Sequence, residues 1–238
     1  MSKSLECLRC RVKSIAIFRK IINPSAHILT LYIKVKEMKL IYKGIYKNAD
    51  QLPKGNLPPD AVKFREPKTP LQLNIVASLF LLPVALLIGL FILLSYLIYG
   101  QIHFQSNSLY FIIGMALSLA TIFPHELLHA VCFGKNAEVQ LFVSLKMLMA
   151  FVVSTQPISK RRFIFLSLLP NLVFGWIPLL LWAVLPYHEV VSNLLFSFSA
   201  LCTFLGAGDY LNVINSLIQM PKGSIQQLSG FNSYWYMG

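Results

Sequence analysis

The chain has 238 residues, of which 56% are hydrophobic and 13% are charged, and its formal net charge is +12. A soluble domain usually carries about 25% charged residues. No charged residue occurs between Lys68 and Glu126, and Glu189 is the only one from Phe163 to Gly208. Uncharged apolar stretches longer than about 18 residues are typical of transmembrane segments. The composition therefore excludes an ordinary soluble enzyme, a disordered chain and a disulfide-stapled secreted domain, and it indicates a polytopic membrane protein.

The basic residues are distributed unevenly along the chain. Fifteen of the 21 Lys and Arg residues lie in the first 68 positions, and five lie between Lys135 and Arg162. None lies in the short linkers at residues 100–107 and 186–189. This asymmetry is the positive-inside pattern, so we expect the basic segments and both termini to face the cytoplasm. The charge then indicates membrane lipid as a partner and no nucleic acid, since no groove-reading motif is present.

The first 70 residues precede the apolar stretches. Residues 1–37 are basic and irregular, and we expect them to be either a flexible N-terminal extension or a segment translated upstream of a true start at Met38. Residues 38–70 are expected to be cytoplasmic, with a strand at Met38–Lys43 before a linker rich in Pro and Gly. Cys7 and Cys10 form a lone C-x-x-C without a second pair, which is weak support for a metal or redox site.

Residues 71–219 are expected to form a membrane domain of four spans. Each span has enough apolar residues to cross a bilayer: Leu73–Tyr99 with a kink at Pro83, Leu109–Phe133, Phe163–Leu185 and Val190–Gln219. Between the second and third spans, residues 138–143 and 149–154 predict two strands of a hairpin near the cytoplasmic surface. Residues 220–238 are expected to be a cytoplasmic tail with an aromatic membrane anchor at Tyr234–Tyr236. The predicted fold is an all-α membrane protein of about four transmembrane helices, with this short β-hairpin and a small basic N-terminal region.

Three ionisable residues occur together in the second span, as H-E-x-x-H at His125, Glu126 and His129. Ionisable groups inside a bilayer are costly and are therefore functional candidates. Residues four apart on a helix leave the same face one turn apart, so the two imidazoles can bind one Zn²⁺. The Glu between them is placed to act as a base on a metal-bound water. The alternative is a polar cluster that binds neighbouring helices.

A catalytic zinc site uses three protein ligands and keeps one position open. Asp209 is the other acidic residue inside a span, and it lies at a depth similar to that of His125, measured from the cytoplasmic helix ends. We therefore predict Asp209 as the third metal ligand, with a helix cap or a salt bridge as its alternative role. Gly206 and Gly208 should let helices approach closely there. If Asp209 is not the ligand, Asn212 or a backbone carbonyl is the next candidate.

Two further features of the spans are less specific. Pro124 removes a helix hydrogen bond just before the motif, which predicts either a simple kink or a backbone opened to water. Asn171 places an amide in the third span, where it could donate to an oxyanion or make an interhelical hydrogen bond in support of the site.

These residues together resemble a known family. A zinc motif in a membrane helix, a later helical Asp and a strand-rich loop between them resemble the site-2 protease intramembrane zinc metallopeptidases. From about Met38 onward the chain more closely resembles bacterial membrane proteins named the putative zincin peptidase family, a domain of unknown function. The stretches that carry this resemblance are Met38–Lys43, Ala61–Pro67, His125–Ala130, Pro157–Phe163, Gly208–Asn212 and Tyr234–Tyr236. The resemblance implies zinc on His125, His129 and Asp209, with Glu126 as the base. Tyr210 after the Asp, and Leu169 before Pro170, depart from the site-2 protease pattern.

We therefore expect an intramembrane zinc metallopeptidase of the H-E-x-x-H type in the bacterial cytoplasmic membrane, which hydrolyses a peptide bond near the cytoplasmic face. Its substrate would be a peptide or a membrane protein. One alternative is a zinc-binding scaffold without catalytic activity. A metal transporter ranks below both, because the polar groups lie at one depth of the membrane only.

Overall fold

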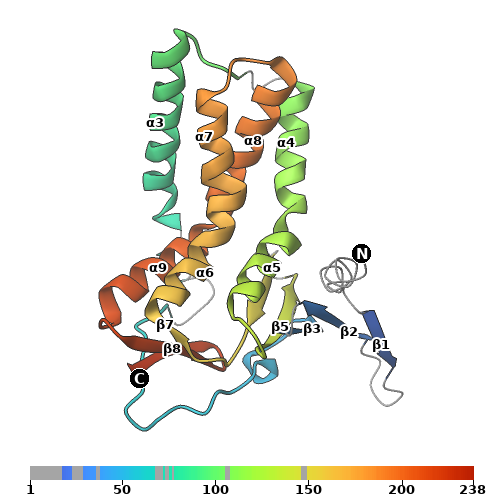
Figure 1. Ribbon diagram of the computed structural model, residues 1–238, viewed down its shortest axis with the longest axis vertical. Coiled ribbons are helices and arrows are strands. Elements are labelled where there is room, and N and C mark those ends of the chain that lie inside the picture. Colours follow the sequence, from blue (N-terminus) through green and yellow to red (C-terminus); the bar gives the residue numbers. More distant parts are fainter. Residues whose placement is uncertain are drawn as a thin grey trace, which may run out of the picture.

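The computed structural model describes residues 18–22, 29–35, 38–67, 72, 75–76, 78–104, 108–145 and 149–238. An upright bundle of helices occupies one end of the molecule, and the strands gather at the other end (Figure 1). Cys7 and Cys10, and most of residues 1–37, lie outside the described residues.

Four helical units form the bundle. They are α3 (Leu81–Tyr99), the bent pair α4 (Leu109–Ala120) and α5 (Ile122–Cys132), the continuous run of α6 (Lys160–Pro170), a π-helical turn (Asn171–Trp176) and α7 (Ile177–Val184), and the bent pair α8 (Glu189–Leu205) and α9 (Ala207–Gln219). Among the described residues, two helices are long and apolar enough to cross a membrane, or four if each bent pair is one span. The bends are 41° and 49°.

The bundle has an apolar outer surface. On α3 the side chains of Leu82 and Leu97 are 69% and 72% exposed, whereas Ser95 is fully buried. A soluble protein would place these residues the other way round, so this surface is suited to contact with lipid. Pro83 lies in the first turn of α3, where no helical N–H is required, so the proline is compatible with the start of this helix.

Two sheets lie below the bundle. The first contains β1 (Phe18–Ile22), β2 (Leu29–Val35), β3 (Met38–Ile45), β5 (Glu138–Ser144) and β6 (Met149–Val153), in that spatial order. All its pairs are antiparallel except β3 and β5, which are parallel. The second has the order β4 (Val62–Lys63), β9 (Asn232–Met237), β8 (Ser224–Ser229) and β7 (Ile158–Ser159). Among the described residues, β6 is the last strand of the first sheet, and its edge opposite β5 has no strand partner there.

The two sheets correct the predicted fold class. The prediction of an all-α protein with one short hairpin was wrong, although the strands at residues 138–144 and 149–153 and the strand at Met38 are confirmed. The alternation of apolar and polar residues predicted these strands but not which strands pair. The reason is that β3 pairs with β5, almost 100 residues away in the sequence. The segment expected to be a C-terminal tail forms the β8–β9 hairpin. Parts of the segment expected to be irregular form β1 and β2.

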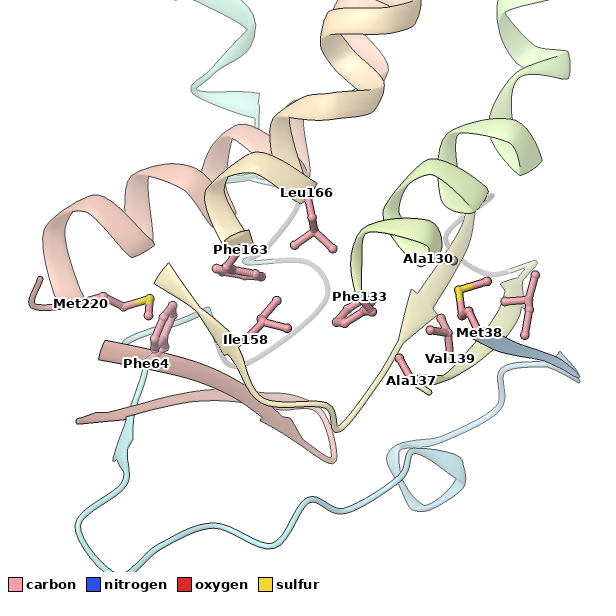
Figure 2. Packing of buried hydrophobic residues seen from close by; sticks show 11 residues of the cluster. Met38, Phe64, Ala130, Phe133, Ala137, Val139, Ile158, Phe163, Leu166 and Met220 are labelled. Atoms are coloured by element: carbon pink, nitrogen blue, oxygen red, sulfur yellow. The ribbon is translucent and has the colours of Figure 1, made fainter. Parts of the chain in front are cut away.

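A single hydrophobic cluster joins the sheets to the helices (Figure 2). Phe64 from the linker before the bundle, Phe133 from the end of α5 and Phe163 from α6 are all buried in it. Met38 of β3 and Ile158 of β7 bring both sheets into the same cluster. This packing sets the position of the strands relative to the end of α5, the helix that carries the H-E-x-x-H motif.

Candidate metal centre

Both bends in the bundle lie next to the predicted site residues. Pro124 has no N–H, and its ring would clash with the carbonyl of Ala120, four residues earlier. Ala120 is the last residue of α4, and α5 starts two residues later, which explains the break at Thr121. At the second bend Gly206 separates α8 from α9, and the N–H of Asp209 donates to the Gly206 carbonyl. The predicted ligands His125 and Asp209 thus lie in the first turns of two helices that start at bends.

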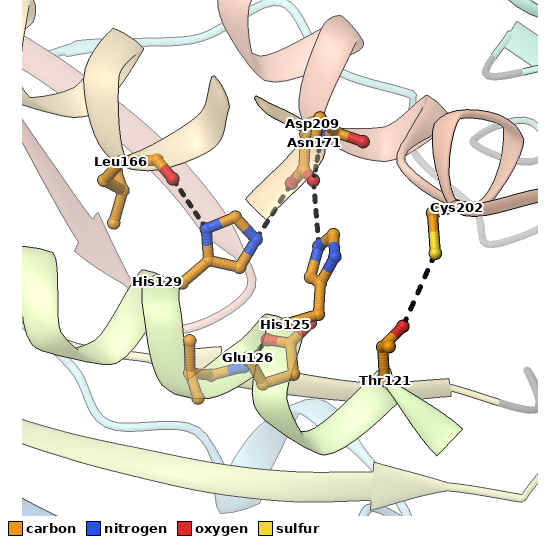
Figure 3. A network of polar contacts seen from close by, with 9 residues as sticks. Thr121, His125, Glu126, His129, Leu166, Asn171, Cys202 and Asp209 are labelled. Atoms are coloured by element: carbon orange, nitrogen blue, oxygen red, sulfur yellow. Dashed lines mark hydrogen bonds and ion pairs between the residues drawn. The ribbon is translucent and has the colours of Figure 1, made fainter. Parts of the chain in front are cut away.

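The two imidazoles meet one carboxylate (Figure 3). His125 Nε2 lies 3.0 Å from Asp209 Oδ2, and His129 Nε2 lies 3.2 Å from Asp209 Oδ1. The side chains of these residues are 10% to 17% exposed. The structure therefore brings together three residues that are up to 84 positions apart in the sequence.

Hydrogen bonds hold His129 and Asp209 in place. His129 Nδ1 is 2.8 Å from the Leu166 carbonyl, so Nδ1 carries a proton, and Nε2 is the ring nitrogen that faces Asp209. Such a carbonyl partner is the usual way in which proteins orient a metal-binding imidazole. Asn171 Nδ2 donates to Asp209 Oδ2 over 2.8 Å from the π-helical turn. Asn171 therefore supports Asp209 directly, and the π-helical turn is a type of distortion that is frequent at functional sites.

Glu126 lies beside these residues but has a different partner. Its Oε2 accepts a hydrogen bond of 2.9 Å from the Val152 N–H on β6. Donor atoms of His125, Glu126 and His129 lie within 4.8 Å of one another, so Glu126 is also a geometric candidate for the third ligand. We favour Asp209, because its oxygens contact Nε2 of both imidazoles, whereas Glu126 is engaged by the strand.

The donor set fits a zinc ion. Ligand atoms 2.0–2.1 Å from a tetrahedral zinc are about 3.3 Å from one another. The two imidazole–carboxylate separations, 3.0 and 3.2 Å, are close to that value. Two imidazoles and one carboxylate are also the ligand set of many catalytic zinc sites, which leave a fourth position open.

Two cavities adjoin the site and share Glu126 in their lining. The smaller one, of about 110 Å³, extends towards Thr121 and Cys202 at the bends of the helices. The larger one, of about 260 Å³, extends towards the sheets and is lined by apolar side chains that include Phe151 and Leu228. Asn212, the next candidate for the third ligand after Asp209, lines this larger cavity. The site is thus accessible from two sides of Glu126.

Two backbone groups at the site could not be identified from the sequence. The Val152 N–H and the Leu166 carbonyl contact Glu126 and His129, yet backbone groups leave no trace in residue type. The prediction that glycine allows close approach holds for Gly206, where a Cβ would overlap the Asn171 side chain. It is wrong for Gly208, where a Cβ would have no neighbour within 4 Å.

His125, Glu126 and His129 have the H-E-x-x-H spacing on α5, the pattern by which zincins are recognised. The model of the family described as "Putative zincin peptidase" matches residues 118–225. The matched segment includes His125, Glu126, His129, Asn171 and Asp209. Neither the curated proteins nor the solved structures gave a match. The predicted resemblance to the zincin peptidase family is confirmed over that segment, and the relation to site-2 proteases stays a prediction.

Proposed function

We propose that this protein is a zinc metallopeptidase of the cytoplasmic membrane, which hydrolyses a peptide bond near the cytoplasmic face. The observation that carries the proposal is the contact of Asp209 with Nε2 of both motif histidines, with Glu126 alongside. His125, His129 and Asp209 would hold the metal. When bound, zinc supplies Lewis-acid activation of a water and of the scissile carbonyl.

Glu126 would act as the general base. Its carboxylate lines both cavities, so it is close to any water or peptide that reaches the metal position from either side. It would accept a proton from the attacking water and deliver it to the departing amine. The Val152 N–H would hold the carboxylate in position until the substrate binds.

The edge of β6 opposite β5, which has no strand partner among the described residues, would bind the substrate as an added strand. Val152 donates to Glu126 and not to β5, so the Leu141–Val152 pair lacks ladder hydrogen bonds. Bonded and non-bonded pairs alternate in antiparallel sheets, which implies that the backbone of Ala150 also points away from β5. Ala150 lines the smaller cavity and Val152 the larger one. A peptide added to this edge would therefore pass along both cavities and in front of Glu126.

Glu126→Gln is the substitution that tests this function. Glutamine keeps the size of the side chain but cannot take the proton, so zinc should stay bound while cleavage falls by about 10²–10⁴-fold. Purified protein in liposomes would be incubated with a peptide library, and new termini would be identified by mass spectrometry.

Glu189→Gln is the matched control, because Glu189 lies in the first turn of α8, remote from the site in sequence and outside both cavities. This variant should cleave like the wild type. Full activity of the Glu126 variant would refute the hydrolase mechanism. Loss of zinc from that variant would instead make Glu126 a ligand.

A further inference from the structure

The end of α9 combines an apolar outer face with two cations. Leu217 and Ile218 are 55% and 78% exposed, whereas Ser216 is fully buried. An outward face of this kind requires hydrocarbon around it, so the last turn of α9 lies at the boundary of the apolar layer.

Lys63 and Arg65 lie beside this boundary. Successive residues of an extended chain point to opposite sides. Phe64 is buried in the hydrophobic cluster, so Lys63 and Arg65 share the opposite, exposed side. The Arg65 N–H donates to Gln219 Oε1 over 2.7 Å, and Gln219 Nε2 donates to the Arg65 carbonyl over 3.3 Å. This pair of hydrogen bonds fixes the basic segment to the C-terminal end of α9.

A cavity of about 370 Å³ lies between these elements. It is lined by Val62, Lys63, Arg65, Ile218, Gln219 and Trp235. The lining thus offers two cations for a phosphate, an indole of the kind found at membrane interfaces, and aliphatic groups for the start of an acyl chain. It includes no acidic side chain. Glu66, the next residue after Arg65, instead accepts a hydrogen bond from the Ser233 N–H.

We propose that this cavity is a binding site for the headgroup of an anionic phospholipid. The phosphate contacts Lys63 and Arg65, and the acyl chains follow Ile218 into the bilayer. A zwitterionic lipid is disfavoured, because its ammonium group would meet the same two cations. The site is separate from the metal centre and does not depend on zinc or on cleavage. It gives the basic segment before α3 a specific contact in addition to the general attraction of cations to the cytoplasmic leaflet.

Native mass spectrometry of the delipidated, detergent-purified full chain tests the proposal. With phosphatidylglycerol as the probe, the wild type should retain one tightly bound lipid. The double variant Lys63→Gln/Arg65→Gln should bind it about 30-fold more weakly, given the usual contribution of each cation at a membrane surface. Lys47→Gln/Lys54→Gln removes the same charge from exposed positions outside the cavity and should bind like the wild type.

Two further arms identify the ligand. Phosphatidylcholine with the same acyl chains should bind far more weakly than phosphatidylglycerol, and excess inorganic phosphate should not displace the lipid. Equal binding of the two lipids, an unchanged affinity in the Lys63/Arg65 variant, or an equal loss in the control pair would overturn the proposal. Displacement by phosphate would mean a site for soluble anions and not for lipid.

Discussion

Gly206 is the residue on which the position of the Asp209 carboxylate depends most closely. Its φ of −79° is accessible to any residue, so the backbone conformation does not require glycine. What requires glycine is space, because a Cβ at this position would overlap Asn171, which donates to Asp209. The geometry of the metal centre therefore depends on a residue that has no chemical group of its own.

Replacing Gly206 by Ala should displace Asn171 and release Asp209. Loss of such a supporting hydrogen bond typically weakens metal binding by about 10–100-fold. Zinc affinity would be measured by competition with a chelator. Gly208→Ala is the matched control, because its Cβ would have no neighbour within 4 Å and its zinc affinity should not change. Equal affinities in the two variants would mean that Asn171 does not position Asp209.

At the scale of elements, β6 is the strand that connects the first sheet to the metal centre. It lies at the end of the sheet and donates its Val152 N–H to Glu126. Proline has no N–H but is tolerated on edge strands where that N–H faces outwards. The backbone contribution of β6 can thus be removed without removing a side chain of the site.

Val152→Pro should keep the sheet and the zinc but lower the rate of peptide cleavage by about tenfold, since one hydrogen bond to a charged group is lost. Val153→Pro should instead disrupt the sheet, because Val153 pairs with Gln140 in the alternate, hydrogen-bonded position of the ladder. Circular dichroism, zinc content and cleavage rate would be compared for both variants. An unchanged rate in Val152→Pro would mean that the backbone of β6 has no role in catalysis or substrate binding.

Some of the helices and strands could be predicted from local sequence, and others could not. The long apolar runs predicted the helices, and the alternation at residues 138–143 and 149–154 predicted β5 and β6. The β8–β9 hairpin was missed because Tyr234–Tyr236 was interpreted as a membrane anchor, although the Ser229-Gly230 turn signal was available. The parallel pairing of β3 with β5 could not be predicted, because contacts between distant segments depend on the whole fold. For the same reason the motif predicted the metal residues but not the Val152 N–H.

In the molecule as a whole, the two sheets lie at the end of the bundle that contains α5 and α9, the helices that carry His125, His129 and Asp209 (Figure 1). The sheets contain or adjoin the basic segments at residues 38–67 and 135–162. Positive charge close to a span resists translocation, so this end should be cytoplasmic. The proposed site would then be accessible from the cytoplasm.

Reporter fusions at Lys135 and at the C terminus should both give cytoplasmic signals, whereas a fusion in the linker at residues 186–188 should give a signal from the opposite side. The fusions would be compared at equal expression, with an enzyme reporter that is active on one side of the membrane only. A signal from the opposite side at Lys135 would invert the topology and place the metal centre away from the cytoplasm.

The zinc content of the purified protein shows whether His125, His129 and Asp209 form a metal centre. Metal analysis of detergent-purified protein should give one zinc per chain for the wild type and for His188→Ala, whose side chain lies at the start of α8 and outside both cavities of the site. His125→Ala should contain almost none, and Asp209→Ala should lose its zinc readily to a chelator, because only two imidazoles remain. Equal zinc in all four proteins, or none in the wild type, would contradict the assignment of His125, His129 and Asp209 as a metal centre.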